Sequence, residues 1–297
     1  MARTTYYGTA FGTTSLELYW ETDGGVRYSH RVMRDQAAYD AWHLAGYLNE
    51  VLTARNLRQD PTLTFAQLLR PEKHLLLYLL LAAHSGLRRV MELGSSLFEI
   101  VDGLELVHEY FRRSPAGAPG PDPARLAYGG VELSPLCAAA SLALHPCADL
   151  TVFGDVTRVS GSWDVLYDRI VAGAAFETAP EAAAFFNRFR AVLLNLFVST
   201  GETFVCPMVG RAFTYLSLQE LLNHLDRPLY HLFGTKAPRA PGEYSADVPV
   251  PVVEGFFLIA EPGLVDAWLG LARRIPEVAA FFTAKSISPR DARALLP

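Results

Sequence analysis

The sequence predicts an α/β protein built on a doubly wound, mostly parallel sheet of seven strands, with a mostly helical cap at the N-terminus. Two observations lead to this prediction. Strand-like apolar runs alternate with segments of helical period along most of the chain. One short apolar strand ends at Glu92, turns at Gly94 and enters an amphipathic helix. Because ligands of such sheets bind at the carboxyl ends of the strands, this turn marks the expected binding edge.

Composition narrows the class of protein. Of 297 residues, 51% are hydrophobic and the net charge is −5, without a basic stripe that could contact nucleic acid. The longest apolar run, 75–83, is too short to cross a membrane, and the first residues lack a signal-peptide core. Neither the eight histidines nor Cys137, Cys147 and Cys206 have metal-ligand spacing. We therefore expect a cytoplasmic protein without a metal and without nucleic-acid or membrane partners.

The N-terminal segment, 1–70, is expected to form a cap or accessory element, and 71–297 the sheet domain. Alternation around 16–20, followed by a turn at 23–25, predicts a small hairpin. Helical spacing then predicts three helices, at about 35–58, 63–69 and 71–84. His74 and His84 lie in the third, apolar helix, and we expect them to pack rather than to bind a ligand.

The first strand–turn–helix unit spans 88–111. Ser96 and Glu99 have capping-box spacing, which predicts that the helix begins within the turn. The apolar positions that follow keep helical period: Leu97, Ile100, Val101, Leu104, Val107 and Phe111.

The remaining elements follow in alternation. A Pro/Gly-rich loop is expected at 114–123, and Ser134-Pro135 and Thr178-Ala179-Pro180-Glu181 have the form of helix starts. Strands are predicted at 126–132, 149–156, 163–170, 203–209, 229–233 and 252–259, the last two as an antiparallel pair. Helices are predicted at 178–197, 216–225 and 262–282.

A series of motifs resembles one family. These are Val90-Met91-Glu92-Leu93-Gly94, Gly130-Val131-Glu132-Leu133-Ser134, Phe153-Gly154-Asp155 and Trp163-Asp164-Val165-Leu166-Tyr167-Asp168. Over about residues 75–260 the chain resembles the class I S-adenosylmethionine (SAM) methyltransferases, which implies their Rossmann-like fold. That family usually has Gly-x-Gly-x-Gly where this chain has Gly94-Ser95-Ser96-Leu97-Phe98, so the amino-acid end of the cofactor must meet bulkier residues.

The resemblance implies a set of cofactor contacts. Glu132, with Leu133 beside it, would accept the ribose hydroxyls, and Asp155 the adenine amino group, with Val156 covering the ring. Glu92 would organise the amino-acid end of SAM, and Gly94, Ser95 and Ser96 would allow close backbone approach. For Glu132 and Asp155 the alternatives are an exposed strand-end carboxylate and a simple turn aspartate.

Tyr167 and Asp168 are the candidate catalytic residues, at the end of the fourth strand. A tyrosine face can stabilise a sulfonium cation, and a carboxylate can orient an amine or take its proton. The alternative is that Asp168 and Arg169 form a strand-end ion pair.

Three functions stay open. The first is transfer of the SAM methyl group to a small molecule. The second is a methyltransferase-like cyclase that makes azetidine-2-carboxylate or 1-aminocyclopropane-1-carboxylate from SAM alone, releasing methylthioadenosine. The third is a non-catalytic SAM-binding protein.

Overall fold

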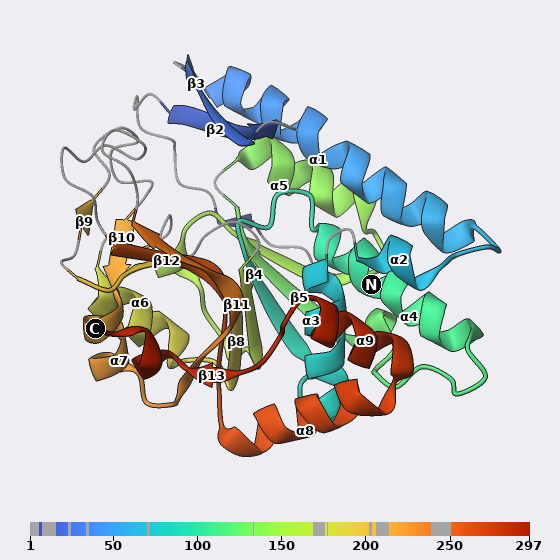
Figure 1. The fold of residues 1–297 in the computed structure, drawn as a ribbon. Coiled ribbons are helices and arrows are strands. Elements are labelled where there is room, and N and C mark those ends of the chain that lie inside the picture. The colour runs from blue at the N-terminus through green and yellow to red at the C-terminus, as the bar shows by residue number, and fades with distance from the viewer. Residues whose placement is uncertain are drawn as a thin grey trace.

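A computed structural model describes residues 6–7, 16–22, 25–33, 36–69, 72–132, 134–168, 176, 178–201, 204–205, 214–238 and 251–297. A mixed sheet with helices on both faces dominates the chain (Figure 1). Among the residues described, no helix combines the length and the apolar character that crossing a membrane requires.

Seven strands form the centre of the sheet. In spatial order they are β6 (Asp149–Phe153), β5 (Ala127–Val131), β4 (Arg89–Leu93), β7 (Val165–Asp168), β8 (Ala191–Ser199), β12 (Pro251–Ala260) and β11 (Leu229–Pro238). The first five run parallel, and β12 runs antiparallel to both of its neighbours. The strand order reverses between β4 and β7, so a crevice is expected beyond the carboxyl ends of these two strands.

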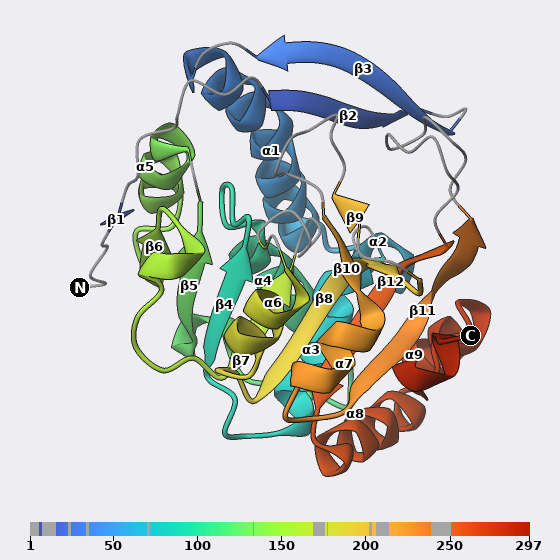
Figure 2. The ribbon, with the colours of Figure 1, turned by 90° about the vertical axis from the view of Figure 1, so that its left-hand side faces the viewer.

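Short strands extend this sheet, and a separate hairpin lies beyond one edge. The extensions are β1 (Tyr6–Tyr7) beside β6, β13 (Arg290–Asp291) beside β11, β10 (Thr214–Ser217) beside β8, and β9 (Phe204–Val205) beside β10. The hairpin consists of β2 (Leu16–Thr22) and β3 (Gly25–Met33), which confirms the prediction from the sequence. It lies above the edge at which β4 ends (Figure 2).

Helices cover both faces of the sheet. One face carries α3 (Glu72–Ala83), α4 (Glu99–Arg113), α5 (Pro135–Leu144), α8 (Pro262–Arg274) and α9 (Pro276–Ala284). The other carries α6 (Ala179–Phe186) and α7 (Leu218–His224), which lie in front of the sheet in Figure 2. The long helix α1 (Gln36–Gln59) lies outside α4 and α5, with the short α2 (Phe65–Leu68) after it.

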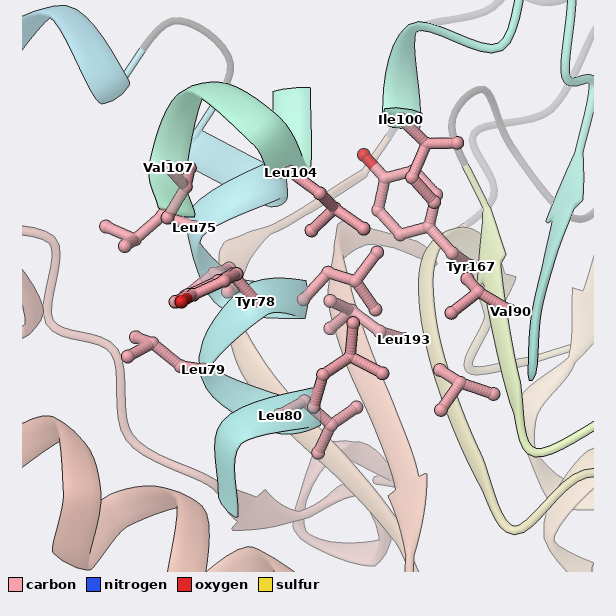
Figure 3. Close-up of a cluster of buried hydrophobic side chains, with 14 of the residues drawn as sticks. Leu75, Tyr78, Leu79, Leu80, Val90, Ile100, Leu104, Val107, Tyr167 and Leu193 are labelled. Carbon is pink, nitrogen blue, oxygen red and sulfur yellow. The ribbon is translucent and has the colours of Figure 1, made fainter. Parts of the chain in front are cut away.

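The main core lies between the first helical layer and the sheet. Leu75 to Leu81 of α3 are all buried, because this helix lies between the sheet and α8. Figure 3 shows side chains of α3 and α4 meeting Val90, Tyr167 and Leu193 of three neighbouring strands. This packing fixes the position of α4 relative to the end of β4.

Two predicted helices are wrong in extent. The helix expected at 178–197 ends at Phe186, and 191–199 form the central strand β8. A short apolar run such as Ala191 to Val198 does not distinguish a doubly buried strand from a buried helix, and the neighbouring strands β7 and β12 decide between them. The helix expected at 262–282 breaks at Ile275, because Pro276 begins the new helix α9.

The fifth strand is therefore β8 rather than the segment 203–209. Within that segment Phe204–Val205 form the short strand β9, and 206–209 lie outside the described residues. The antiparallel pairing of the last two predicted strands is confirmed by β11 and β12.

Candidate functional site

The turn after β4 has an unusual backbone. Gly94, Ser96 and Phe98 have φ angles of 62°, 46° and 57°, in the left-handed region. Glycine adopts this conformation freely, whereas for serine and phenylalanine it is strained. In the motif that the sequence resembles, glycine stands at these same three positions, and here serine and phenylalanine adopt the conformation that glycine favours. The capping box expected between Ser96 and Glu99 is wrong, since α4 begins at Glu99 after a left-handed Phe98.

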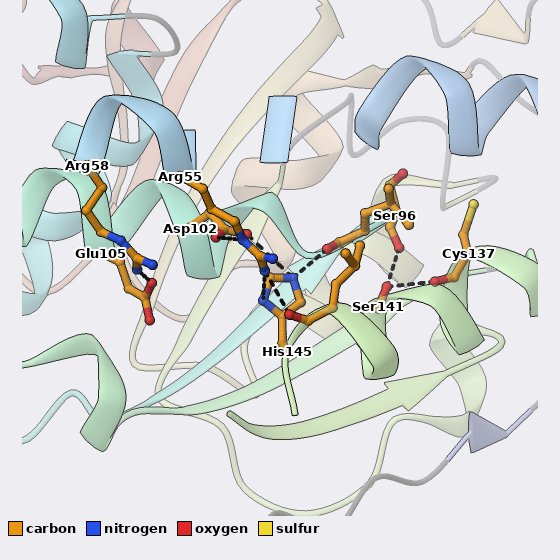
Figure 4. Close-up of polar contacts among 10 residues, drawn as sticks. Arg55, Arg58, Ser96, Asp102, Glu105, Cys137, Ser141 and His145 are labelled. Atoms are coloured by element: carbon orange, nitrogen blue, oxygen red, sulfur yellow. Dashed lines mark hydrogen bonds and ion pairs between the residues drawn. The ribbon is translucent and has the colours of Figure 1, made fainter. Parts of the chain in front are cut away.

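Helix α5 and the residue after it hold this turn from outside. Ser141 Oγ lies 2.8 Å from the Ser96 carbonyl oxygen and 2.7 Å from that of Cys137. His145 Nε2 lies 2.9 Å from the Leu97 carbonyl oxygen, and because a carbonyl only accepts, the ring nitrogen must donate. Figure 4 shows Ser141 and His145 pointing at successive peptide units of the turn.

Glu132 connects the turn to the start of α5. Its carboxylate is buried, with Oε2 accepting a 2.8 Å hydrogen bond from Ser96 N and Oε1 a 2.7 Å bond from Ser134 N. A carboxylate oxygen can accept more than one hydrogen bond, which is compatible with a ligand hydroxyl at this group. Leu133, predicted to lie beside the ribose, is outside the described residues.

The turn packs directly on β5. A Cβ atom on Gly130 would lie 2.2 Å from Phe98 Cζ and 2.4 Å from Ser95 Oγ, so only glycine fits there. Ser95 and Ser96 are fully buried, and among the described residues neither hydroxyl has a hydrogen-bond partner. A buried hydroxyl without a partner is costly, so these two fit a polar ligand bound at the turn.

Asp155 follows β6, as predicted. Its carboxylate accepts a 2.7 Å hydrogen bond from Thr157 N and caps the 3₁₀ turn η2 (Val156–Arg158). The half-buried Val156 packs against the core on the second face of the sheet. The adenine role of both residues stays a prediction.

Glu92 and Tyr167 are register partners on β4 and β7, so their side chains share the sheet face towards α3 and α4. Both are fully buried. The partner of Asp168 in the ladder is Leu93, and its side chain is outside the described residues. The catalytic roles of Tyr167 and Asp168 stay predictions.

His74 joins this buried group, although the sequence suggested only packing. Its ring centroid lies 6.1 Å from that of Tyr167. A Cβ on Gly103 of α4 would lie 2.0 Å from His74 Nδ1, so the glycine allows the imidazole to lie against the helix. Glycine inside an otherwise strong helix is the signal that could have drawn attention to His74.

Helix α1 is joined to α4 by a partly buried ion pair. Arg55 Nε donates to Asp102 Oδ1 at 2.7 Å, and Nη2 to the Leu144 carbonyl at 2.7 Å. His145 Nδ1 lies 3.5 Å from the same guanidinium. Burial lowers the pKa of His145 and so favours the neutral ring. The carboxylate of Asp102 partly opposes this effect. One turn further along α1, Arg58 pairs with Glu105.

Two cavities flank α4. The first, of about 450 Å³, lies between α1, α3 and α4; the second, of about 270 Å³, lies beside Arg55, Asp102 and His145. Within the described ranges, no group of three or more His, Cys, Asp or Glu side chains has an arrangement suited to a metal ion.

The strand order, the left-handed turn and the acidic residues near the ends of β4, β5 and β6 define a Rossmann-like protein with the class I methyltransferase fold. No family model matches the sequence, and no curated protein matches it.

Several solved structures are similar to this chain. The N-terminal domain of EvdMO1 with S-adenosylhomocysteine (SAH) bound is 13% identical to this chain. The match covers 79% of this chain and 100% of that chain, with a TM-score of 0.41. A TehB-like SAM-dependent methyltransferase from Corynebacterium glutamicum is 11% identical, with 76% and 99% covered and a TM-score of 0.39. The plantazolicin methyltransferase BpumL in complex with SAH is 11% identical, with 75% and 99% covered and a TM-score of 0.34.

Proposed function

We propose that this protein binds SAM at the carboxyl ends of β4, β5 and β6 and transfers its methyl group to a small molecule. The observation that carries the proposal is the turn after β4. Its strained left-handed backbone holds two buried serine hydroxyls, of Ser95 and Ser96, that have no hydrogen-bond partner among the described residues, and Ser96 N donates to the Glu132 carboxylate. Strained backbone and orphaned buried hydroxyls both cost stability, and a ligand that uses them explains why they persist.

The chain would divide the work of binding among three strand ends. Glu132 accepts the ribose hydroxyls, and Asp155 with Val156 holds the adenine. Glu92 and the Gly94–Ser96 backbone hold the amino-acid end. SAM supplies a methyl group already activated by its sulfonium, so the protein has to align the acceptor and exclude water.

Cyclisation of SAM is the second candidate, and one observation favours it. Ser96 and Phe98 occupy the second and third glycine positions of the turn, with Phe98 buried beneath it. In this function the turn would hold the methionine chain bent. Its amine or α-carbon, having lost a proton, attacks the γ-carbon, and methylthioadenosine leaves.

Product analysis separates the functions. Purified protein is incubated with SAM alone and then with SAM and candidate acceptors, and the products are identified by mass spectrometry. S-adenosylhomocysteine (SAH) that forms only with an acceptor supports methyl transfer, whereas methylthioadenosine from SAM alone supports cyclisation. If neither product forms although SAM binds tightly, the result supports the non-catalytic function.

Binding is tested separately by calorimetry with SAH on Glu132→Gln. Loss of a charge-assisted hydrogen bond worth about 1.5–3 kcal/mol should weaken SAH binding tenfold or more. Glu261→Gln, an exposed glutamate without a side-chain capping bond, is the matched control and should bind normally. Because Glu132 also accepts two backbone hydrogen bonds, the melting temperature of each variant is measured alongside. Unchanged affinity in a folded Glu132→Gln protein would refute the ribose assignment.

A further inference from the structure

Helix α1 reaches the turn after β4 from outside through two residues one helical turn apart. Val51 is fully buried and packs against Leu97 of the turn and Cys137 of α5. Arg55, four positions later, donates a hydrogen bond to the carbonyl oxygen of Leu144 at the end of α5. Residues four apart lie on the same face of a helix, so one face of α1 carries both contacts.

The Arg55 guanidinium has a donor for each of its neighbours. Nε donates to Asp102 Oδ1 at 2.7 Å, and Nη2 donates to the Leu144 carbonyl oxygen at 2.7 Å. Nη2 has a second hydrogen, and His145 Nδ1 lies 3.5 Å from Nη2 (Figure 4). Because a guanidinium never accepts a hydrogen bond, Nδ1 must present its lone pair to Arg55.

The turn requires the same form of the His145 ring from the other side. Nε2 lies 2.9 Å from the Leu97 carbonyl oxygen, which only accepts, so the ring hydrogen is on Nε2. A neutral ring with its hydrogen on Nε2 satisfies Arg55 and Leu97 together. The other neutral form, with the hydrogen on Nδ1, satisfies neither, because it places donor against donor and lone pair against carbonyl oxygen.

Asp102 competes with Leu97 for the hydrogen on His145. Its Oδ2 lies 3.6 Å from His145 Nε2, while its Oδ1 accepts from Arg55. Burial and the positive charge of Arg55 lower the pKa of His145, whereas the carboxylate of Asp102 raises it. Without Arg55, Asp102 would therefore attract the Nε2 hydrogen away from the turn and favour a charged ring. Further titratable side chains around the same cavity are those of Arg58, Glu105, Tyr128 and Cys147.

We propose that Arg55 is a positioning residue of the SAM site: it holds His145 neutral with the hydrogen on Nε2, and His145 in turn holds the Leu97 carbonyl and the shape of the turn after β4. The proposal rests on the proposed function and deepens it. It makes the cap helix α1 contribute to SAM binding through a residue that need not touch the cofactor.

Arg55→Lys tests this role. Lysine keeps a positive charge opposite Asp102 but loses the planar fork that serves Leu144 and His145 at the same time. Arg58→Lys, one turn further along α1 and opposite Glu105, is the matched control. Calorimetry measures SAH affinity, and long-range proton–nitrogen NMR of the imidazole shows which ring nitrogen carries the hydrogen. The melting temperature of each variant is measured alongside.

The wild type should show the His145 hydrogen on Nε2 at pH 8, and Arg55→Lys should show a mixture of the two neutral forms. SAH affinity should fall about fivefold in Arg55→Lys, the effect of losing one ordinary hydrogen bond. In a His145→Ala background, which has no ring to position, Arg55→Lys should weaken SAH binding no further. Arg58→Lys should change neither the ring nor the affinity.

Any one of three results would overturn the proposal. The first is a His145 ring that has its hydrogen on Nδ1 in the wild type or is unaltered in Arg55→Lys. The second is unchanged SAH affinity in a folded Arg55→Lys protein. The third is full additivity of Arg55→Lys and His145→Ala, since a merely structural arginine would weaken binding equally in both backgrounds. Failure of SAH to bind the wild type would instead count against the proposed SAM site, and the NMR measurement, which needs no ligand, would then decide the role of Arg55 alone.

Discussion

His145 Nε2 donates a 2.9 Å hydrogen bond to the carbonyl oxygen of Leu97, between the two strained residues Ser96 and Phe98. Replacing His145 by alanine leaves a buried carbonyl without its donor, which costs about 1–3 kcal/mol of unfolding free energy. We expect SAH affinity to fall as well, because the turn loses a support. His145→Gln can still donate from its amide and should recover part of both losses.

Urea unfolding and calorimetry with SAH measure the two effects. His224→Ala, at the exposed end of α7, is the control and should change neither. Normal SAH affinity in His145→Ala would show that the turn keeps its shape without this hydrogen bond.

The same histidine should make stability depend on pH. Burial lowers the pKa of His145 below its ordinary value of 6.5. As pH falls through 6.5, the unfolded chain therefore takes up a proton before the native ring does, and the native state loses stability down to the lowered pKa. Above about pH 7 this contribution is constant.

Melting temperatures of the wild type and of His145→Gln between pH 5 and 8 isolate this contribution. The melting temperature of the wild type should exceed that of His145→Gln most at pH 7–8, and this difference should shrink towards pH 5. An advantage that grows towards pH 5 would mean instead that a charged His145 pairs with Asp102 in the native state.

Ser96 offers a substitution with opposite effects on stability and binding. Ser96→Gly removes the left-handed strain and a buried hydroxyl that has no hydrogen-bond partner among the described residues, and we expect a gain of about 1 kcal/mol in unfolding free energy. If the hydroxyl contacts SAM, SAH affinity should fall in the same variant. Thermal unfolding measures the change in stability, and calorimetry measures the change in SAH affinity. A gain in both would show that the Ser96 hydroxyl has no role in binding.

Two arginines one turn apart on α1 allow a matched comparison. Arg55→Met leaves the carboxylate of Asp102 buried without its partner, which should cost about 3 kcal/mol. Arg58 and Glu105 are both about one-third exposed, so Arg58→Met should cost less than about 1 kcal/mol. Urea unfolding measures both. Equal costs would show that the Asp102 pair is solvated as well as the outer pair is.

Much of the sheet was predictable, because its parallel strands end in turn residues and acidic side chains that are visible in the sequence. The strand at 191–199 was not, since a run buried on both faces has no period of its own. The conformation of Ser96 and Phe98 was also hidden, because neither residue favours a positive φ.

The contacts that support the site join residues far apart in the chain. His145 is 48 residues from Leu97, and Arg55 is 47 residues from Asp102. No local pattern encodes such pairs; they depend on how α1, α4 and α5 pack. The division of the chain near residue 70 likewise stays a prediction.

The last prediction concerns the end of β7. Adenosine contacts are expected from the first three strands in chain order, so a residue at the end of the fourth should affect turnover more than cofactor binding. Asp168→Asn should therefore lower kcat while SAH affinity stays close to that of the wild type. Tyr167→Phe keeps the aromatic face and should retain much of the activity, if that face stabilises the sulfonium.

Tyr167→Leu supplies the contrast, because it keeps an apolar side chain in the core but removes the π face. Tyr167→Ala would leave a large cavity costing about 3–5 kcal/mol, which makes it a poor test of chemistry. We expect kcat to fall strongly in Tyr167→Leu and SAH to bind all three variants. Because Tyr167 is buried beside His74, a folded Tyr167→Leu protein with the wild-type rate would mean that the ring only packs. Wild-type rates in Asp168→Asn as well would place the reacting carbon away from the end of β7.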